Sequence, residues 1–108
     1  MSVDNKNNMG AYGAASTDTA QTGAVTATRS GIAYAIGTQR IDPGKTAYVQ
    51  IIVNGGVRAQ ANYTQPGGYQ TGAEATSCWI NVGESVYAKC YAQYSGYSCG
   101  VALVVPMA

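Results

Sequence analysis

Residues 45–64 read KTAYVQIIVNGGVRAQANYT, and this stretch carries the clearest signal for the fold. The segments 45–53 and 57–64 are rich in β-branched and aromatic residues, which favour strands. Between them stands Asn54-Gly55-Gly56, a sequence that accepts the positive backbone φ angles of a tight hairpin turn. Apolar and polar residues alternate in the second segment, which is typical of a strand with one buried and one wet face. The stretch therefore predicts an antiparallel hairpin packed on a core.

Further short strand segments flank this hairpin on both sides. They follow one another at intervals of about 8–12 residues with turn-forming residues between them, which is the spacing of a sandwich or a barrel. A chain of 108 residues is long enough for one such domain. We expect the additional strands at 25–28, 32–36, 75–82, 85–93 and 98–105. The sequence thus predicts an all-β domain over residues 24–108.

Residues 1–23 differ from the rest of the chain, because they are small and polar and show neither helical nor alternating periodicity. We expect them to form an extended N-terminal arm that cannot build a core of its own. Its few apolar anchors are Val3, Met9 and Tyr12, and we expect the arm to dock on a partner through them. The polar start and the lack of a following apolar run predict a chain made in the cytoplasm without a cleaved signal.

Three of the expected strands, 32–36, 76–82 and 99–105, are apolar on both faces. In a two-layer fold this pattern indicates that one face packs on the core and the other on a second chain. The residues predicted to mediate this self-association are Ala33, Ala35, Trp79, Ala102 and Val104.

The composition argues against several classes of function. Lys and Arg number 6 against 5 Asp and Glu, and this balance does not support nucleic-acid binding. The longest apolar run, 101–105, is far shorter than the ~20 residues of a membrane helix. The chain has no His for an acid–base or nucleophilic site and no acid or Cys cluster for a metal, so we expect no enzyme activity, metal or cofactor. The sequence does not decide whether Glu74 and Glu84 form the carboxylate pair of a glycosidase, because it does not show the distance between them.

The three cysteines, Cys78, Cys90 and Cys99, fall on expected inward faces without CxxC spacing. An odd number of cysteines in a chain made in the cytoplasm favours free thiols. We expect all three to be reduced, with Cys78 and Cys90 as the pair that deserves a test.

A group of tyrosines lies near the strand 85–93 and the loop after it. Exposed tyrosines beside amide side chains are suited to packing against another subunit or to stacking on sugar rings, although some serve neither purpose. The group consists of Tyr87, Tyr91, Tyr94 and Tyr97. Subunit packing is the first interpretation, and glycan binding is the second.

The stretches AYVQIIVNGG (47–56), INVGESVYA (80–88) and CGVALVVPM (99–107) resemble the globular head of the collagen-tailed complement component, a tumour-necrosis-factor-like jelly roll. The resemblance covers residues 31–107. It implies a small antiparallel jelly-roll sandwich that forms a tight trimer, with the strands that resemble 32–36, 76–82 and 99–105 facing the threefold axis. The calcium-binding acids of that family have no counterpart in this sequence.

These observations together are typical of an assembly component: a small protein with no export signal and no active site that trimerises and extends an arm. The leading prediction is a trimeric phage capsid decoration (cement) protein on the virion surface, whose arm locks neighbouring capsid subunits. The alternative is a trimeric recognition module, such as a tail-fibre tip or adhesin head, that binds host surface glycans or proteins.

Overall fold

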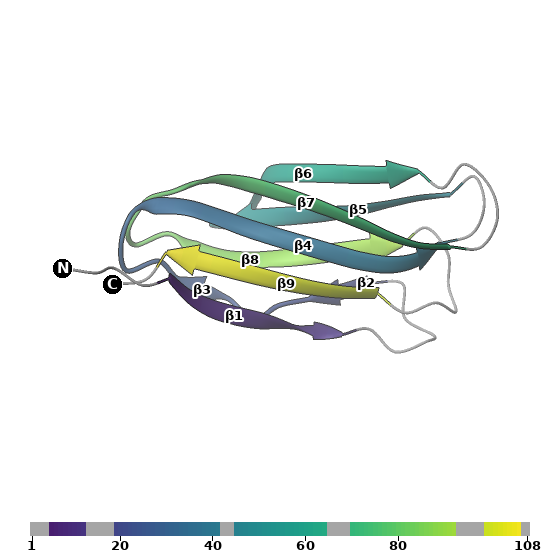
Figure 1. Cartoon of the computed structure of the whole chain (residues 1–108). Coiled ribbons are helices and arrows are strands. Elements are labelled where there is room, and N and C mark those ends of the chain that lie inside the picture. The colour runs from purple at the N-terminus through teal and green to yellow at the C-terminus, as the bar shows by residue number, and fades with distance from the viewer. Residues whose placement is uncertain (1–4, 13–18, 42–44, 65–69, 93–98, 107–108) are drawn as a thin grey trace.

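The computed structural model describes residues 5–12, 19–41, 45–64, 70–92 and 99–106, which form two stacked antiparallel sheets (Figure 1). No described segment is a helix of the length and apolarity needed to cross a bilayer. The strands within these ranges are β1 (Asn5–Tyr12), β2 (Thr19–Gln21), β3 (Val25–Thr26), β4 (Gly31–Ile41), β5 (Thr46–Val53), β6 (Gly56–Thr64), β7 (Gln70–Ile80), β8 (Ser85–Ala92) and β9 (Cys99–Pro106).

The first sheet has the order β1-β9-β4-β7, and the second has the order β2-β8-β5-β6 with β3 also paired to β8. All the pairings are antiparallel. Strands that follow one another in the chain, such as β7 and β8 or β8 and β9, lie in different sheets. This crossing between layers confirms the predicted all-β jelly-roll sandwich.

The hairpin predicted at residues 45–64 is present as β5 and β6. Asn54 and Gly55 have φ angles of 50° and 86°, the positive pair that a tight hairpin turn requires. A bulge between Ile51 and Ile52 shifts the register near this turn. The bulge adds a residue to β6 at Arg58, whose side chain leaves the sheet face for the β7–β8 turn.

The core lies between the two sheets and follows from the period-two alternation of the strands. In β8, for example, every second residue is buried and the residues between them are partly exposed. β-branched and small side chains from both sheets fill the space between the layers. The main cluster comprises Ala20, Ala27, Ala33, Ala35, Val49, Ile51, Val53, Ile80, Val86, Ala88, Cys90, Cys99, Val101, Leu103 and Val105.

The described parts of residues 1–23 are strands that lie on the sandwich of their own chain. β1 pairs with β9 at the edge of the first sheet, and β2 pairs with β8 at the edge of the second. Backbone pairing at a sheet edge needs no apolar side chains, so a polar segment can occupy it. Met9 is the register partner of Ala102 and Tyr12 that of Gly100, while Val3 lies outside the described residues. The docking of this segment on another protein stays a prediction.

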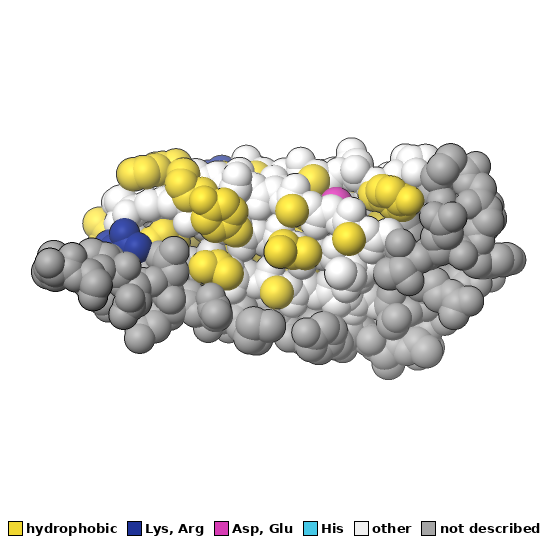
Figure 2. All heavy atoms as spheres, in the orientation of Figure 1, with side chains coloured by type: hydrophobic (Ala, Val, Ile, Leu, Met, Phe, Trp, Pro, Cys, Tyr) yellow, Lys and Arg dark blue, Asp and Glu magenta, His cyan; other side chains and the backbone are white. Residues whose placement is uncertain are grey.

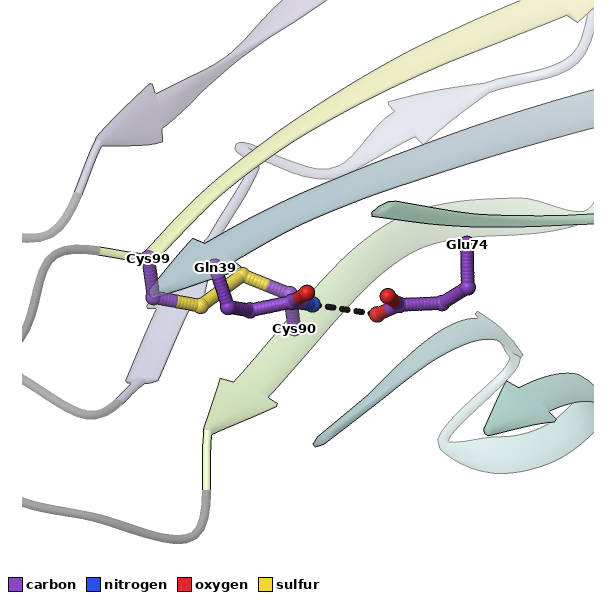
Figure 3. Close-up of a disulfide and its surroundings, with 4 residues drawn as sticks. All are labelled: Gln39, Glu74, Cys90 and Cys99. Carbon is purple, nitrogen blue, oxygen red and sulfur yellow. Dashed lines mark hydrogen bonds between the residues drawn. A yellow bond between two sulfur atoms is a disulfide. The ribbon is translucent and has the colours of Figure 1, made fainter. Parts of the chain in front are cut away.

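Cys90 in β8 and Cys99 in β9 form a disulfide that joins the two sheets (Figure 3). The prediction of three free thiols is therefore wrong, and Cys78 alone is free. The reason is topological: the chain crosses from the second sheet to the first between these two strands. Their ends therefore face each other across the core, with the Cα atoms 6.7 Å apart. The pair singled out from the sequence, Cys78 and Cys90, is not the one that forms.

Candidate functional site

The outer face of the second sheet carries aromatic and polar side chains in ordered rows, and we call it the polar–aromatic face. One row crosses four strands, because Thr19 pairs with Tyr91, Tyr91 with Tyr48, and Tyr48 with Asn62. The neighbouring row is formed in the same way by Gln21, Lys89, Gln50 and Gln60. The face is defined by Thr19, Gln21, Tyr48, Gln50, Gln60, Asn62, Tyr87, Lys89 and Tyr91.

Two tyrosines form a ring platform in the middle of this face. The rings of Tyr48 and Tyr91 are stacked, with centroids 5.2 Å apart and planes inclined by 27°. Both residues are only partly buried, so the platform remains open to solvent on its outer side. The stack follows from the register that places β5 and β8 side by side with these two residues directly opposite.

A chain of amide groups runs beside the platform. Gln50 Nε2 donates to Gln60 Oε1 at 2.7 Å, and Gln60 Nε2 donates to Asn62 Oδ1 at 2.8 Å. Each amide has two donor hydrogens and an oxygen with two lone pairs, so these two bonds use only part of the capacity of the three groups. The bonds fix the orientation of the side chains and leave the row able to bind hydroxyl groups.

The charge on the polar–aromatic face comes from Lys89. The two described glutamates lie elsewhere: Glu74 is buried between the sheets, and Glu84 lies in the turn between β7 and β8. Among the residues that the structure describes, no group of three or more His, Cys, Asp or Glu is placed to hold a metal ion. The face therefore offers ring stacking, amide hydrogen bonds and one cation.

Of the four tyrosines that the sequence singled out, two belong to this face. Tyr87 and Tyr91 point outward from β8, whereas Tyr94 and Tyr97 lie outside the described residues. Tyr48 was missed by the sequence-based reasoning. Its signal was the alternation of β5, in which Ala47 and Val49 are buried and Tyr48 lies on the opposite side.

The outer face of the first sheet is different, and we call it the apolar face. It consists of the outward positions of β4, β7 and β9, over which Figure 2 shows hydrophobic side chains gathered. Its large members are Ile32, Tyr34, Ile36 and Trp79, between 38% and 54% exposed.

The residues predicted for self-association fall into two groups. Trp79, Ala102 and Val104 do lie on the apolar face. Ala33 and Ala35 do not, because both are fully buried in the core, at 0% and 1% exposure. The strand 32–36 is apolar at every position, so the sequence could not distinguish its two faces, and the inward one was chosen.

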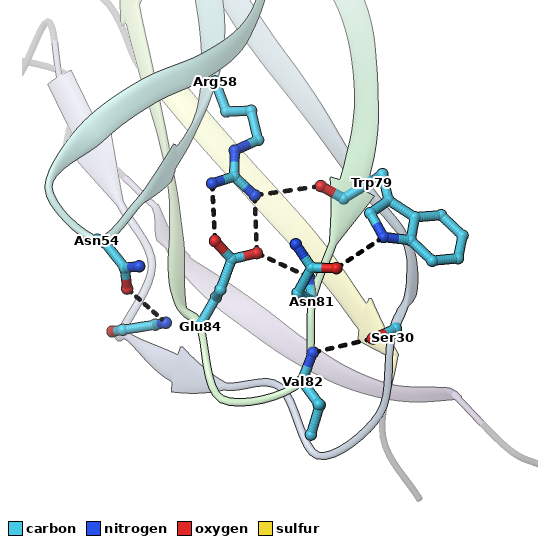
Figure 4. A network of polar contacts seen from close by, with 8 residues as sticks. Ser30, Asn54, Arg58, Trp79, Asn81, Val82 and Glu84 are labelled. Atoms are coloured by element: carbon cyan, nitrogen blue, oxygen red, sulfur yellow. Dashed lines mark hydrogen bonds and ion pairs between the residues drawn. The ribbon is translucent and has the colours of Figure 1, made fainter.

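A polar network closes the end of the sandwich beside Trp79 (Figure 4). Arg58 donates two hydrogen bonds to the Glu84 carboxylate, at 2.8 and 2.7 Å, and another to the Trp79 carbonyl. The Arg58 guanidinium, and then the backbone N–H of Asn81, lower the pKa of Glu84 to about 2. The indole N–H of Trp79 donates to Asn81 Oδ1 at 3.0 Å. These bonds secure the β7–β8 turn to β6 and hold the Trp79 ring.

Glu74 is buried in the core beside Gln39, near the disulfide (Figure 3). Gln39 Nε2 donates to Glu74 Oε1, while Gln39 Oε1 and Glu74 Oε2 have no partner among the described atoms. Burial raises the pKa of Glu74 to about 7, and the Gln39 hydrogen bond opposes this rise.

The glycosidase pair of Glu74 and Glu84 is ruled out by its geometry. Glu74 is six residues before the end of β7 at Ile80, and Glu84 lies in the turn beyond that end. At ~3.3 Å per strand residue, Glu74 is roughly 20 Å from the end of β7. Glycosidase carboxylates stand ~5–9.5 Å apart, so these two cannot act on one bond.

No protein-family model matches the chain, and no curated protein sequence matches it. Similar folds are found among solved structures. An exo-β-1,3-galactanase from Phanerochaete chrysosporium, solved with galactose, aligns at 14% identity with a TM-score of 0.52, over 96% of this chain and 30% of that one. A cycloisomaltooligosaccharide glucanotransferase from a Paenibacillus species aligns at 12% identity with a TM-score of 0.51, over 93% of this chain and 16% of that one.

A family 35 carbohydrate-binding module from Clostridium thermocellum aligns at 19% identity with a TM-score of 0.47, over 90% of this chain and 71% of that one. At identities this low, the two alignments with TM-scores above 0.5 show a shared fold alone. The leading prediction of a phage capsid decoration protein is contradicted, because the proteins that share the fold are named for their action on sugars.

Proposed function

We propose that this chain is a non-catalytic recognition module that binds glycans on its polar–aromatic face. The observation that carries the proposal is the Tyr48–Tyr91 platform with the amide row beside it. The C–H face of a sugar ring packs on an aromatic ring, while its hydroxyls need donors and acceptors at the edge of that ring. The face combines the two within neighbouring rows of one sheet.

The fold supports the same proposal. The galactanase and glucanotransferase with TM-scores above 0.5 are named for their action on carbohydrates, and this chain spans 30% and 16% of their lengths. The distant placement of Glu74 and Glu84, in a chain without histidine, supports binding rather than hydrolysis. Membership of the tumour-necrosis-factor-like family and the homotrimer that it implies stay predictions from the sequence.

The test is isothermal titration with short oligosaccharides, after a panel of soluble polysaccharides has been screened by affinity electrophoresis. Tyr48→Ala and Tyr91→Ala should each weaken binding roughly 10- to 100-fold, the size expected for loss of a central aromatic contact. Gln60→Ala, which removes the middle amide of the row, should cause a smaller loss. The matched control is Tyr34→Ala, which removes an exposed tyrosine from the opposite sheet.

A short oligosaccharide occupies one site, so the titration does not depend on whether the protein associates with itself. The proposal fails if no polysaccharide in the panel is retarded. It also fails if Tyr48→Ala binds as tightly as the wild type, or if Tyr34→Ala loses as much affinity as the two platform variants.

A further inference from the structure

The apolar face has a bulky end and a small end, and the strand register shows this directly. At one end Ile32 of β4 lies opposite Trp79 of β7. The next outward residue of β4, Tyr34, lies opposite Val104 of β9. At the other end the outward positions are small. They are Ala73, Ala75, Thr38, Gly100 and Ala102, with Ile36 between the two groups.

The small end forms an open hollow between β4 and β9. It is lined by Ile36, Thr38, Gly100, Val101 and Ala102. Gly100 has no side chain and is itself buried, and the partly exposed Ala102 beside it has a short one. No charged residue occupies the outward positions of β4, β7 and β9 whose side chains the structure describes. The described part of the face is therefore uncharged, uneven and largely apolar.

We propose that this face binds the same face of a second copy of the chain in a two-fold symmetric dimer, which would take the place of the homotrimer predicted from the sequence. The two-fold axis lies in the plane of the interface and runs across the strands, so the bulky end of one copy lies over the small end of the other. On β7, Trp79 then faces the partner's Ala73. On β4, Ile32 faces the partner's Thr38, and Tyr34 faces the partner's Ile36. Large side chains thus meet small ones at the outer contacts, as close packing of two sheets requires.

The size of the face sets the strength of the dimer. Three strands ~4.8 Å apart, over about seven residues at ~3.3 Å each, give a patch of roughly 14 by 23 Å, on the order of 300 Å² in projection per copy. This is less than half of the about 800 Å² per partner that a standard specific interface buries. We therefore expect a weak dimer, with a dissociation constant on the order of 100 μM.

The dimer would leave both polar–aromatic faces outward on opposite sides, because each is the far face of its own sandwich (Figure 1). Two sites on one particle raise the apparent affinity for a multivalent surface. This consequence rests on the proposed glycan binding, whereas the dimer itself does not. The experiment below measures mass rather than glycan binding, so it separates the failure of one proposal from that of the other.

The experiment is sedimentation equilibrium of the whole chain over roughly 5–500 μM, with circular dichroism to verify the fold of each variant. The wild type should shift from monomer to dimer across this range. Ile36→Lys places a charge in the middle of the face and should remain monomeric. The matched control is Val57→Lys, since Val57 is equally exposed, at 55%, on β6 of the other sheet. This variant should dimerise like the wild type.

A complementation experiment tests the alignment of the two copies. Tyr34→Glu alone should also be monomeric, because it places a carboxylate against the partner's Ile36. An equimolar mixture of Tyr34→Glu and Ile36→Lys should restore a dimer, since the two charges then face each other. A wild type that stays monomeric at 500 μM or forms trimers would overturn the proposal. So would folded Ile36→Lys that still dimerises, or a mixture that stays monomeric.

Discussion

The buried carboxyl group of Glu74 makes the stability of this protein depend on pH in a window where little else titrates. Burial raises its pKa to about 7 from 4.5, and the chain contains no histidine. In the folded state Glu74 therefore binds its proton up to about pH 7, whereas in the unfolded chain it releases the proton near pH 4.5. Between these values the folded state holds more protons than the unfolded state.

The sign and the size of the effect follow from proton linkage. Because the folded state binds the additional proton, the free energy of unfolding falls as the pH rises from 4.5 to 7. Each pKa unit corresponds to about 1.4 kcal/mol, so the total loss is about 3 kcal/mol. Above pH 7 the carboxyl is ionised in both states, and the contribution of Glu74 no longer changes.

The assay is urea unfolding of the oxidised protein at pH values from 4.5 to 7, followed by circular dichroism. Glu74→Gln keeps an amide beside Gln39 and should abolish the slope. Glu84→Gln is the matched control: the pKa of Glu84 is lowered to about 2, so its stabilising effect is lost only as the pH falls from 4.5 towards 2. The control should keep the wild-type slope. A flat profile for the wild type, or an unchanged slope in Glu74→Gln, would refute the reasoning.

Three further predictions concern other parts of the sandwich. Cys99→Ser should cost about 2–3 kcal/mol in urea unfolding, the value for a cross-link between residues 9 apart, whereas Cys78→Ser should cost less. Gly37→Ala should lower the melting temperature, because the added Cβ would come within 2.9 Å of Glu74 Oε1 in the core. Arg58→Met should raise the pKa of Glu84 in an NMR titration, though not to 4.5, since the backbone hydrogen bond remains; an unchanged pKa would contradict the assignment.

The sequence by itself determined the local structure of this protein. The Asn54-Gly55 turn and the alternation of the strand that follows it were readable without coordinates, because both depend on residues close together in the chain. The same reasoning failed where the alternation was absent. In the strand 32–36 every residue is apolar, so the face that contains Ala33 and Ala35 could not be distinguished from the face of Tyr34.

Only the tertiary structure decided which strands lie side by side. Cys90 and Cys99 meet because the chain changes sheets between them, and Glu74 meets Gln39 because β7 pairs with β4. The Tyr48–Tyr91 platform likewise exists because β5 and β8, remote in sequence, are neighbours in register. Periodicity along the chain fixes which side of a strand a residue occupies. It cannot fix the partner across the sheet or the core, because strand order depends on packing between distant segments.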